Sequence, residues 1–148
     1  MDSLKVFSDR GYVIDEAGPV YYTKDMDKTG KWFQEVLGWY YELDSRDAEG
    51  KGLYGSVFNL PHEIDCLHIA PFTGIHMFYG EPKGGVVAFM RMRGIEALNK
   101  YVTDKDYKNI SEIQEQPWGA KVCTVTTPDG YDLQFFESTA PQVLGKCS

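Results

Sequence analysis

The sequence lacks the features that mark several large classes of protein. Its three cysteines are odd in number and none stands in a CxxC pair, so we expect no disulfide framework and a reducing, cytoplasmic location. No apolar run approaches the ~20 residues needed to span a bilayer. The first residues, 1–13, are interrupted by charges and lack the continuous apolar segment of a signal peptide. We therefore expect no membrane association.

Positive charge is also scarce. The chain carries 15 Lys and Arg against 22 Asp and Glu, for a formal net charge of −7. Nucleic-acid binding needs clustered Lys and Arg, so a nucleic-acid partner is not expected. A neutral or cationic small molecule fits this charge better, the alternative being an ordinary acidic, solvated surface. P-loop, Rossmann and GxSxG motifs are absent as well.

Aromatic residues, by contrast, are plentiful. The chain has 10 Tyr, 8 Phe and 3 Trp, and 43% of its residues are hydrophobic. That is enough to bury a core in a chain of 148 residues. Small-ligand pockets also favour Tyr and Trp, which have an apolar body and a polar tip. Some of these rings are therefore candidates for a binding site.

The first half of the chain predicts a strand, a helix and further strands. Residues 18–23 are rich in β-formers, Asp25 is a candidate N-cap, and apolar residues at near-helical spacing predict a helix over 26–37 that Gly38 ends. The other expected segments are strands at 39–43, 53–60 and 64–70, a charged loop at 45–52, and a further extended segment at 75–79.

After a Pro- and Gly-containing linker at Glu81–Gly85 the same order begins again. The expected elements are a strand at 86–92, a helix opening at Gly94, strands at 111–116 and 120–126, a Pro-Asp-Gly turn, and a last strand at 131–137. The predicted organisation is thus an N-terminal extension (1–15), a first module (16–80), a second module (86–138) and a tail (139–148), together forming one domain.

Two stretches resemble a known superfamily. Tyr21–Trp39 (YYTKDMDKTGKWFQEVLGW) resembles its opening strand, amphipathic helix and V-L-G-aromatic ending. Trp118-Gly119, followed by Thr127–Glu137 (TPDGYDLQFFE), resembles its closing P-D-G turn and strand. On these motifs the chain is identified as similar to the vicinal oxygen chelate superfamily, which includes glyoxalases, bleomycin-resistance proteins and extradiol dioxygenases.

This resemblance implies an α+β fold in which two βαβββ modules form a curved mixed sheet around a central pocket. Metal-dependent members place a donor on the first and last strand of each module. In this chain those positions fall on Gly18, near His68, on Val86 and on Gln134. Gly and Val have no side chain that can bind a metal. Shifting the expected positions by one residue along the first strands of the two modules does not place a donor on both strands.

The resemblance therefore predicts a protein without a metal cofactor. His68 and Gln134 remain as two candidate metal donors, too few to hold zinc, nickel or iron well against water. A separate cluster of His62, His68 and His76 matches no closed zinc motif. His68 is alternatively a core histidine or a polar contact to a ligand.

Other candidates follow from the alternation of side chains along the expected strands and from the chemistry of those side chains. The expected ligand-binding residues are His68, Gln134, Tyr40, Phe58, Phe89, Trp118 and Phe136. Glu137 is a candidate catalytic base if it is buried; the alternative is a solvated strand end. Arg91 and Arg93 face either solvent or an anionic ligand.

Two functions follow from the resemblance. The first is a metal-free binding protein of bleomycin-resistance type, which sequesters a planar or cationic compound in an aromatic pocket. The alternative is an enzyme, a metal-dependent glyoxalase-like lyase or isomerase or a dioxygenase. The missing donors favour the binding protein, although fold alone does not fix function. The resemblance also implies a homodimer.

Overall fold

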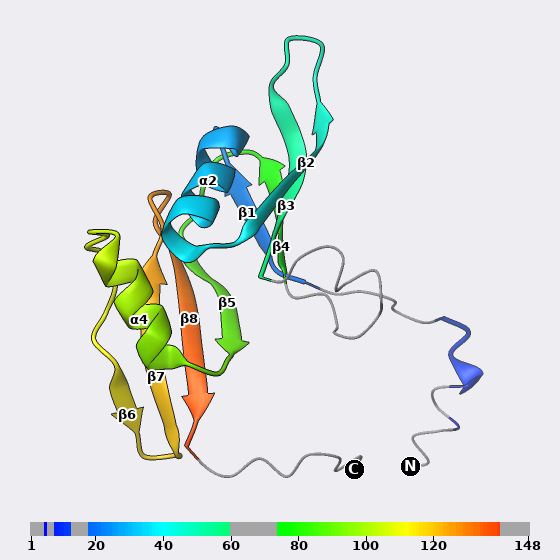
Figure 1. Cartoon of the computed structure of the whole chain (residues 1–148). Coiled ribbons are helices and arrows are strands. Elements are labelled where there is room, and N and C mark those ends of the chain that lie inside the picture. Colours follow the sequence, from blue (N-terminus) through cyan, green and yellow to red (C-terminus); the bar gives the residue numbers. More distant parts are fainter. Residues whose placement is uncertain (1–4, 6–7, 13–17, 60–73, 140–148) are drawn as a thin grey trace.

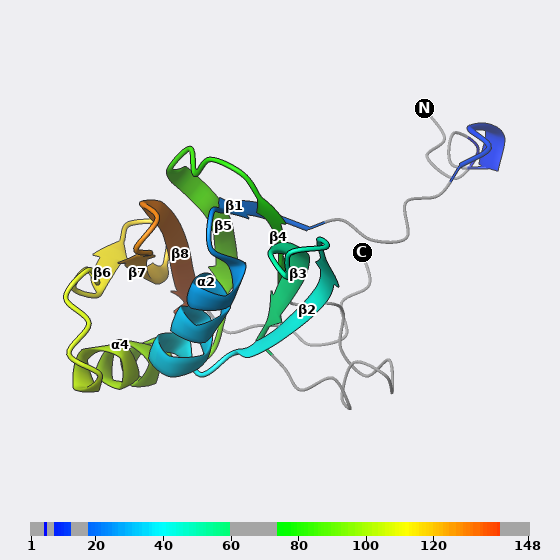
Figure 2. The same ribbon diagram turned by 90° about the horizontal axis from the view of Figure 1, so that it is seen from above.

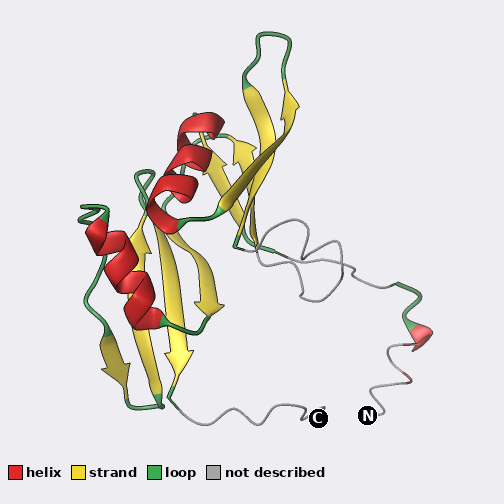
Figure 3. Cartoon of the chain, viewed as in Figure 1, coloured by secondary structure: helices red, strands yellow, loops and turns green. Residues whose placement is uncertain are grey.

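The computed structural model describes residues 5, 8–12, 18–59 and 74–139 of the 148. Figures 1 and 3 show how these residues form strands with a helical segment after the first strand of each half. In chain order the elements are β1 (Val20–Thr23), α2 (Met26–Trp32), η1 (Phe33–Leu37), β2 (Tyr40–Arg46), β3 (Gly52–Phe58), β4 (Gly74–Tyr79), β5 (Gly85–Arg91), α4 (Ile95–Asp104), β6 (Gln114–Gln116), β7 (Ala120–Thr126) and β8 (Tyr131–Ser138).

The strands form two mixed sheets of four. The first sheet has the order β1-β4-β3-β2 and the second the order β5-β8-β7-β6. In each, the first strand pairs in parallel with the last, and the other pairs are antiparallel. The expected α+β fold with two βαβββ units is confirmed. The two sheets remain separate (Figure 1) and are not joined edge to edge.

The last strand of the first module is not where the sequence places it. The strand that completes the first sheet, between β1 and β3, is β4 (Gly74–Tyr79), which corresponds to the extended segment expected at 75–79. The strand expected at 64–70 stays a prediction. Residues 64–70 lie outside those that the structure describes. The expected loop at 45–52 is also shorter, since β2 runs to Arg46 and β3 begins at Gly52.

The expected helix over 26–37 is confirmed, with a change of geometry along it. The Asp25 carboxylate accepts a hydrogen bond from the Lys28 backbone N–H at 3.1 Å, as an N-cap does. The last turn, η1, is a π-helix. Gly38 ends it at φ 75°, a left-handed conformation that glycine adopts without steric cost.

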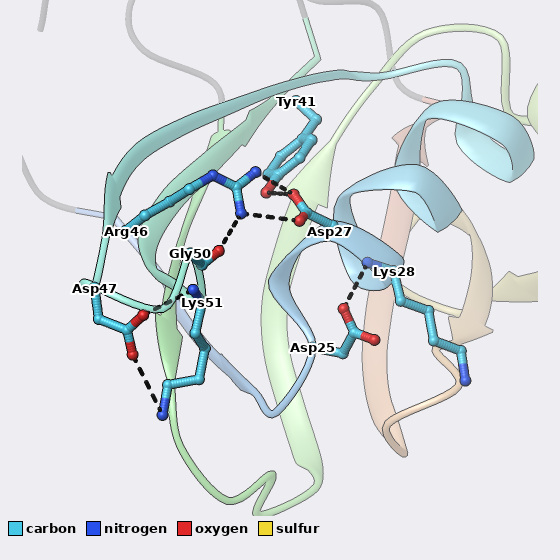
Figure 4. Close-up of polar contacts among 8 residues, drawn as sticks. All are labelled: Asp25, Asp27, Lys28, Tyr41, Arg46, Asp47, Gly50 and Lys51. Carbon is cyan, nitrogen blue, oxygen red and sulfur yellow. Dashed lines mark hydrogen bonds and ion pairs between the residues drawn. The ribbon is translucent and has the colours of Figure 1, made fainter.

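A polar cluster ties the long β2–β3 hairpin to α2 (Figure 4). The Arg46 guanidinium donates to both oxygens of Asp27 at 3.1 Å, and the Tyr41 hydroxyl donates to Asp27 at 3.0 Å. The hydrogen bond from Arg46 holds the pKa of the Asp27 carboxyl below its usual value.

The Tyr41 ring lies directly on Gly30, where an added Cβ would sit 2.4–2.5 Å from ring carbons. The hairpin therefore rests on a helix position that has no side chain.

Gly30→Ala is expected to lower the free energy of unfolding. Alanine in a helix is favoured over glycine by about 1 kcal/mol, but displacing the Tyr41 ring costs about 1–3 kcal/mol, so the clash decides the sign. Urea unfolding of Gly30→Ala and of Gly30→Ala/Tyr41→Leu measures this. If Gly30→Ala lowers the free energy of unfolding as much with Leu at position 41 as with Tyr41, the Tyr41 ring is not the obstacle.

Each sheet is covered by helix on one face. α2 contacts β2, β3 and β4, α4 contacts β7 and β8, and α4 also contacts η1, so the helical layer is continuous between the halves (Figure 2). Strand residues alternate accordingly, and in β8 the side chains of Tyr131, Leu133 and Phe135 are buried. A single core cluster contains residues of both halves, among them Phe33 and Ile95. We call the opposite face of each sheet its open face.

A buried polar contact joins the two halves. The Tyr21 hydroxyl, on β1, donates to the Asp129 carboxylate at 2.8 Å and lies 2.8 Å from the Thr127 hydroxyl. The Thr29 hydroxyl, on α2, also donates to Asp129 at 3.2 Å. The Tyr21 ring packs on Tyr131 with centroids 4.3 Å apart. Burial raises the pKa of the Tyr21 hydroxyl well above its usual value, so it stays a donor throughout the physiological range.

Tyr21→Phe is expected to destabilise the fold by about 1–3 kcal/mol, because a hydrogen bond to a carboxylate is lost where water has little access. Thermal and urea unfolding measure the loss, and Tyr12→Phe, at a ring that is 59% exposed, is the matched control. Equal stability of the two variants would show that the hydroxyl does not hold the halves together.

Candidate functional site

Three aromatic side chains lie together on the open face of the second sheet. Phe89 on β5 and Phe136 on β8 are stacked, with centroids 4.3 Å apart and an interplanar angle of 12°. Trp118, in the turn before β7, meets Phe136 edge-on at 6.2 Å. Phe89 and Trp118 are 54% and 59% exposed, which is unusual for large apolar rings in mutual contact. We call these three residues the second-sheet aromatic patch.

Two polar residues border this patch. Gln134 is opposite Phe89 in the parallel β5–β8 pair, and its half-buried side chain is on the same face as Phe136. The Arg91 guanidinium carbon lies 6.0 Å from the Phe136 ring centroid. The structure thus brings together four of the expected ligand-binding residues, Gln134, Phe89, Trp118 and Phe136.

A cavity of about 820 Å³ adjoins the patch and lies between the two halves. This is within the range of small-molecule pockets, roughly 300–1,000 Å³. Phe89 and Arg91 belong both to the open face and to the wall of the cavity. The first half contributes Gly18, Pro19, Leu37, Gly38, Trp39, Asn59 and Gly74, and the second contributes residues 87–92 with Ala97, Leu98, Tyr101 and Phe135. Sequence reasoning did not find this cavity, because its walls come from segments that only the fold brings together.

The remaining expected aromatic residues lie on the first sheet. Tyr40 on β2 and Phe58 on β3 are directly opposite each other in the antiparallel pair. They are on the open face of that sheet, and Tyr40 is 50% exposed. They therefore form a pair apart from the second-sheet aromatic patch.

His76 occupies the position that sequence reasoning gave to His68. In the second sheet Gln134 is opposite Phe89, and in the first sheet His76 is opposite Val20. Val20 follows Gly18 by two residues, and Phe89 follows Val87 by two. His76 is thus the counterpart of Gln134, whereas His68 lies outside the described residues. The position expected from the sequence falls too early because the sequence predicts the last strand of the first module at 64–70.

In the second half, too, a position expected from the sequence is displaced, here by one residue, from Val86 to Val87. Gly18 lies seven residues before Asp25, the N-cap of α2, and Val87 lies seven before Gly94, the N-cap of α4. Val87, not Val86, lines the cavity. A register shift between Val86 and Ala88 leaves Val87 as the extra residue of a β-bulge, which re-aims the side chains around it.

Among the described residues, the donors at the expected positions do not fit a metal ion. His76 and Gln134 belong to different sheets, and the corresponding first-strand positions, Gly18 and Val87, carry no donor. Within residues 18–59 and 74–139, no group of three or more His, Cys, Asp or Glu side chains could hold a metal ion. Zinc and related ions in proteins take three or four side-chain ligands, so these two do not form such a centre.

Glu137 has a structural partner. Its carboxylate accepts hydrogen bonds from the backbone N–H groups of Gly94 at 3.0 Å and Ile95 at 2.9 Å. Gly94 is the N-cap residue of α4 and Ile95 is its first residue, and the glycine has no side chain to bond these amides. A carboxylate there also interacts favourably with the helix dipole. Glu137, a candidate base on sequence grounds, thus caps α4 from β8.

Glu137→Ala is expected to lower the free energy of unfolding by about 0.5–2 kcal/mol, the usual cost of losing an N-cap side chain. Chemical unfolding compares it with Glu112→Ala, at an exposed carboxylate elsewhere. A loss no larger than that of Glu112→Ala would contradict the capping role.

A known structure resembles this chain in sequence and in fold. A glyoxalase-related enzyme from Clostridium phytofermentans is 55% identical, with a TM-score of 0.82, over 88% of this chain and 99% of that one. The chain belongs to the vicinal oxygen chelate superfamily. Within it, the bleomycin resistance protein domain matches residues 18–80.

More distant superfamily members share the fold. The bleomycin resistance determinant encoded on the transposon Tn5 is 14% identical, with a TM-score of 0.60, over 86% of this chain and 100% of that one. A bleomycin-binding protein complexed with bleomycin is 15% identical, with a TM-score of 0.59, over 84% and 99%. No functionally curated protein matches the chain. Among the described residues, no helix has the length and apolar character needed to cross a membrane.

Proposed function

We propose that this protein is a metal-free binding protein of bleomycin-resistance type, which sequesters a planar or cationic compound. The observation that carries the proposal is the second-sheet aromatic patch beside an 820 Å³ cavity. Exposed, stacked rings offer a face on which a planar ligand gains about 0.5–1.5 kcal/mol per ring beyond its area burial. The cavity accepts the rest of the ligand.

Charge and relatives support the same proposal. A net charge of −7 favours cationic over anionic ligands. A superfamily member of the same fold is complexed with bleomycin. The absence of a donor set for a metal among the described residues favours binding without a cofactor. The expected homodimer and cytoplasmic location stay predictions. Light scattering would measure the oligomeric state.

The alternative is a metal-dependent lyase, isomerase or dioxygenase using zinc, nickel or iron. One observation favours it: the 55% identical superfamily member is described as a glyoxalase-related enzyme. Against it stands the donor set, which supplies His76 and Gln134 on separate sheets. Metal content separates the two functions.

Elemental analysis after incubation with Zn, Ni, Mn and Fe(II) is expected to find far less than one ion per chain. Bleomycin and ethidium, a planar cation, are expected to bind and to quench the fluorescence of Trp118. Phe89→Leu is expected to weaken their binding about threefold to tenfold, through loss of stacking.

Phe78→Leu, at a half-exposed ring of the first sheet, is the control and is expected to leave planar-ligand affinity unchanged. Close to one ion per chain, with turnover of glyoxalase or dioxygenase substrates, would overturn the proposal. So would equal effects of the two substitutions.

A further inference from the structure

The cavity between the two halves runs along the free edge of β5. Residues 87–92 all line its wall, and 87–91 belong to β5. Successive side chains of a strand point to opposite faces of the sheet, so a cavity that contacts all of them must follow the edge of the strand. β5 is at the end of the second sheet and pairs only with β8 among the described strands, and its other edge faces the first half (Figures 1 and 2). The cavity therefore leads from the open face of the second sheet to its helix-covered face.

On the helix-covered side the wall of the cavity is apolar. Met90 is opposite the buried Phe135 in the β5–β8 pair, and both residues line the cavity. Leu98 on α4 and Leu37 at the end of η1 belong to the same wall. Methionine is flexible and fills irregular space, so Met90 can adapt to a bound chain. This end of the cavity is suited to a hydrocarbon group.

The helical layer bounds the cavity through a contact between Tyr101 on α4 and Gly38 at the end of η1. Both residues line the cavity. A Cβ added to Gly38 would lie 3.0 Å from the Tyr101 hydroxyl and 3.4–3.5 Å from its ring carbons. The two halves therefore touch here, and the Tyr101 ring adds further apolar surface to the wall.

The wall offers no partner for a positive charge. None of the described residues that line the cavity is acidic, and its polar side chains are those of Asn59 and Arg91 with the polar tips of Trp39 and Tyr101. A cation without a counter-charge is costly to remove from water, and Arg91 would also repel it. The net charge of −7 favours cations at the surface, but these residues disfavour them inside the cavity.

From this arrangement we infer that the cavity takes an uncharged hydrocarbon arm of the ligand, while the planar group lies on the second-sheet aromatic patch and any cationic group stays outside. The inference rests on the proposed function and narrows its ligand class to planar compounds that carry an apolar arm. Phe89 belongs both to the patch and to the wall, so the arm passes from the ring face into the cavity at this residue.

Three acridine dyes test the inference on the full chain. Acridine orange has no arm, its 10-nonyl derivative has a hydrocarbon arm, and quinacrine has an arm that ends in an ammonium group. Titrations followed by dye fluorescence anisotropy are expected to give the nonyl dye an affinity at least tenfold higher than that of acridine orange. This gain corresponds to about 1.4 kcal/mol, the burial of about two CH₂ groups. Quinacrine is expected to bind no more tightly than acridine orange.

Substitutions on α4 locate the arm. Ala97 is exposed and lines the cavity, so Ala97→Phe fills the cavity without replacing a core residue. It is expected to lower the ratio of the nonyl-dye affinity to the acridine-orange affinity from at least ten to about one. Thr103→Phe, at an exposed position of the same helix away from the cavity, is the matched control and is expected to leave the ratio unchanged. Ala97→Glu is expected to raise quinacrine affinity at least threefold, because it supplies the missing counter-charge.

The outcomes separate this inference from the proposed function. If acridine orange binds but the ratio is near one, or if Ala97→Phe and Thr103→Phe change it equally, the inference is wrong and the proposed function stands. If only the nonyl dye binds, and Ala97→Phe weakens it, the cavity takes the arm and the stacking on which the proposed function depends is wrong. If none of the three dyes binds, both are overturned. Circular dichroism of the free variants verifies that they are folded.

Discussion

The hydrogen bond from the Tyr21 hydroxyl to the Asp129 carboxylate is the contact on which the arrangement of the two halves depends. It joins the first strand of one βαβββ unit to the last turn of the other, and Thr29 adds a second bond from α2. The Asp129 carboxylate is half-buried, so losing one of its neutral donors is expected to cost stability, because a charge with little access to water needs its partners. The cavity lies between these halves, so its shape follows from how that contact sets them.

Among the described residues, the superfamily fold is combined with a donor set that does not suit a metal. Gly18 and Val87 stand where metal-binding relatives need donors, and the remaining polar positions, His76 and Gln134, belong to separate sheets. Aromatic side chains occupy the open faces instead. Ligand recognition by ring faces and a few polar groups is therefore the chemistry that the described residues support best.

Much of the fold was predictable from local sequence signals. Asp25 and Gly38 bound the first helix because a carboxylate caps amides and glycine accepts a positive φ. The site was less predictable. A one-residue error in register moves side chains to the other face, and the bulge at Val87 has no local signature. His76 was missed for the same reason, since its role depends on which segment pairs with β1. The alternation of side chains along the strands was enough to place Phe89 and Phe136 on one face.

The contact between the halves also bears on what the Glu81–Gly85 linker does. Tyr21, Thr29 and Asp129 meet through space, and none of them belongs to the linker. The linker makes contacts of its own, since the Lys83 N–H donates to the Tyr131 hydroxyl at 3.0 Å and Glu81 pairs with Lys24, and it also raises the effective concentration of one half around the other. A chain cut within it would still present the same matching surfaces, as two fragments that reassemble by a bimolecular reaction. Covalent continuity at this point governs how fast the halves meet, while side chains decide how they fit.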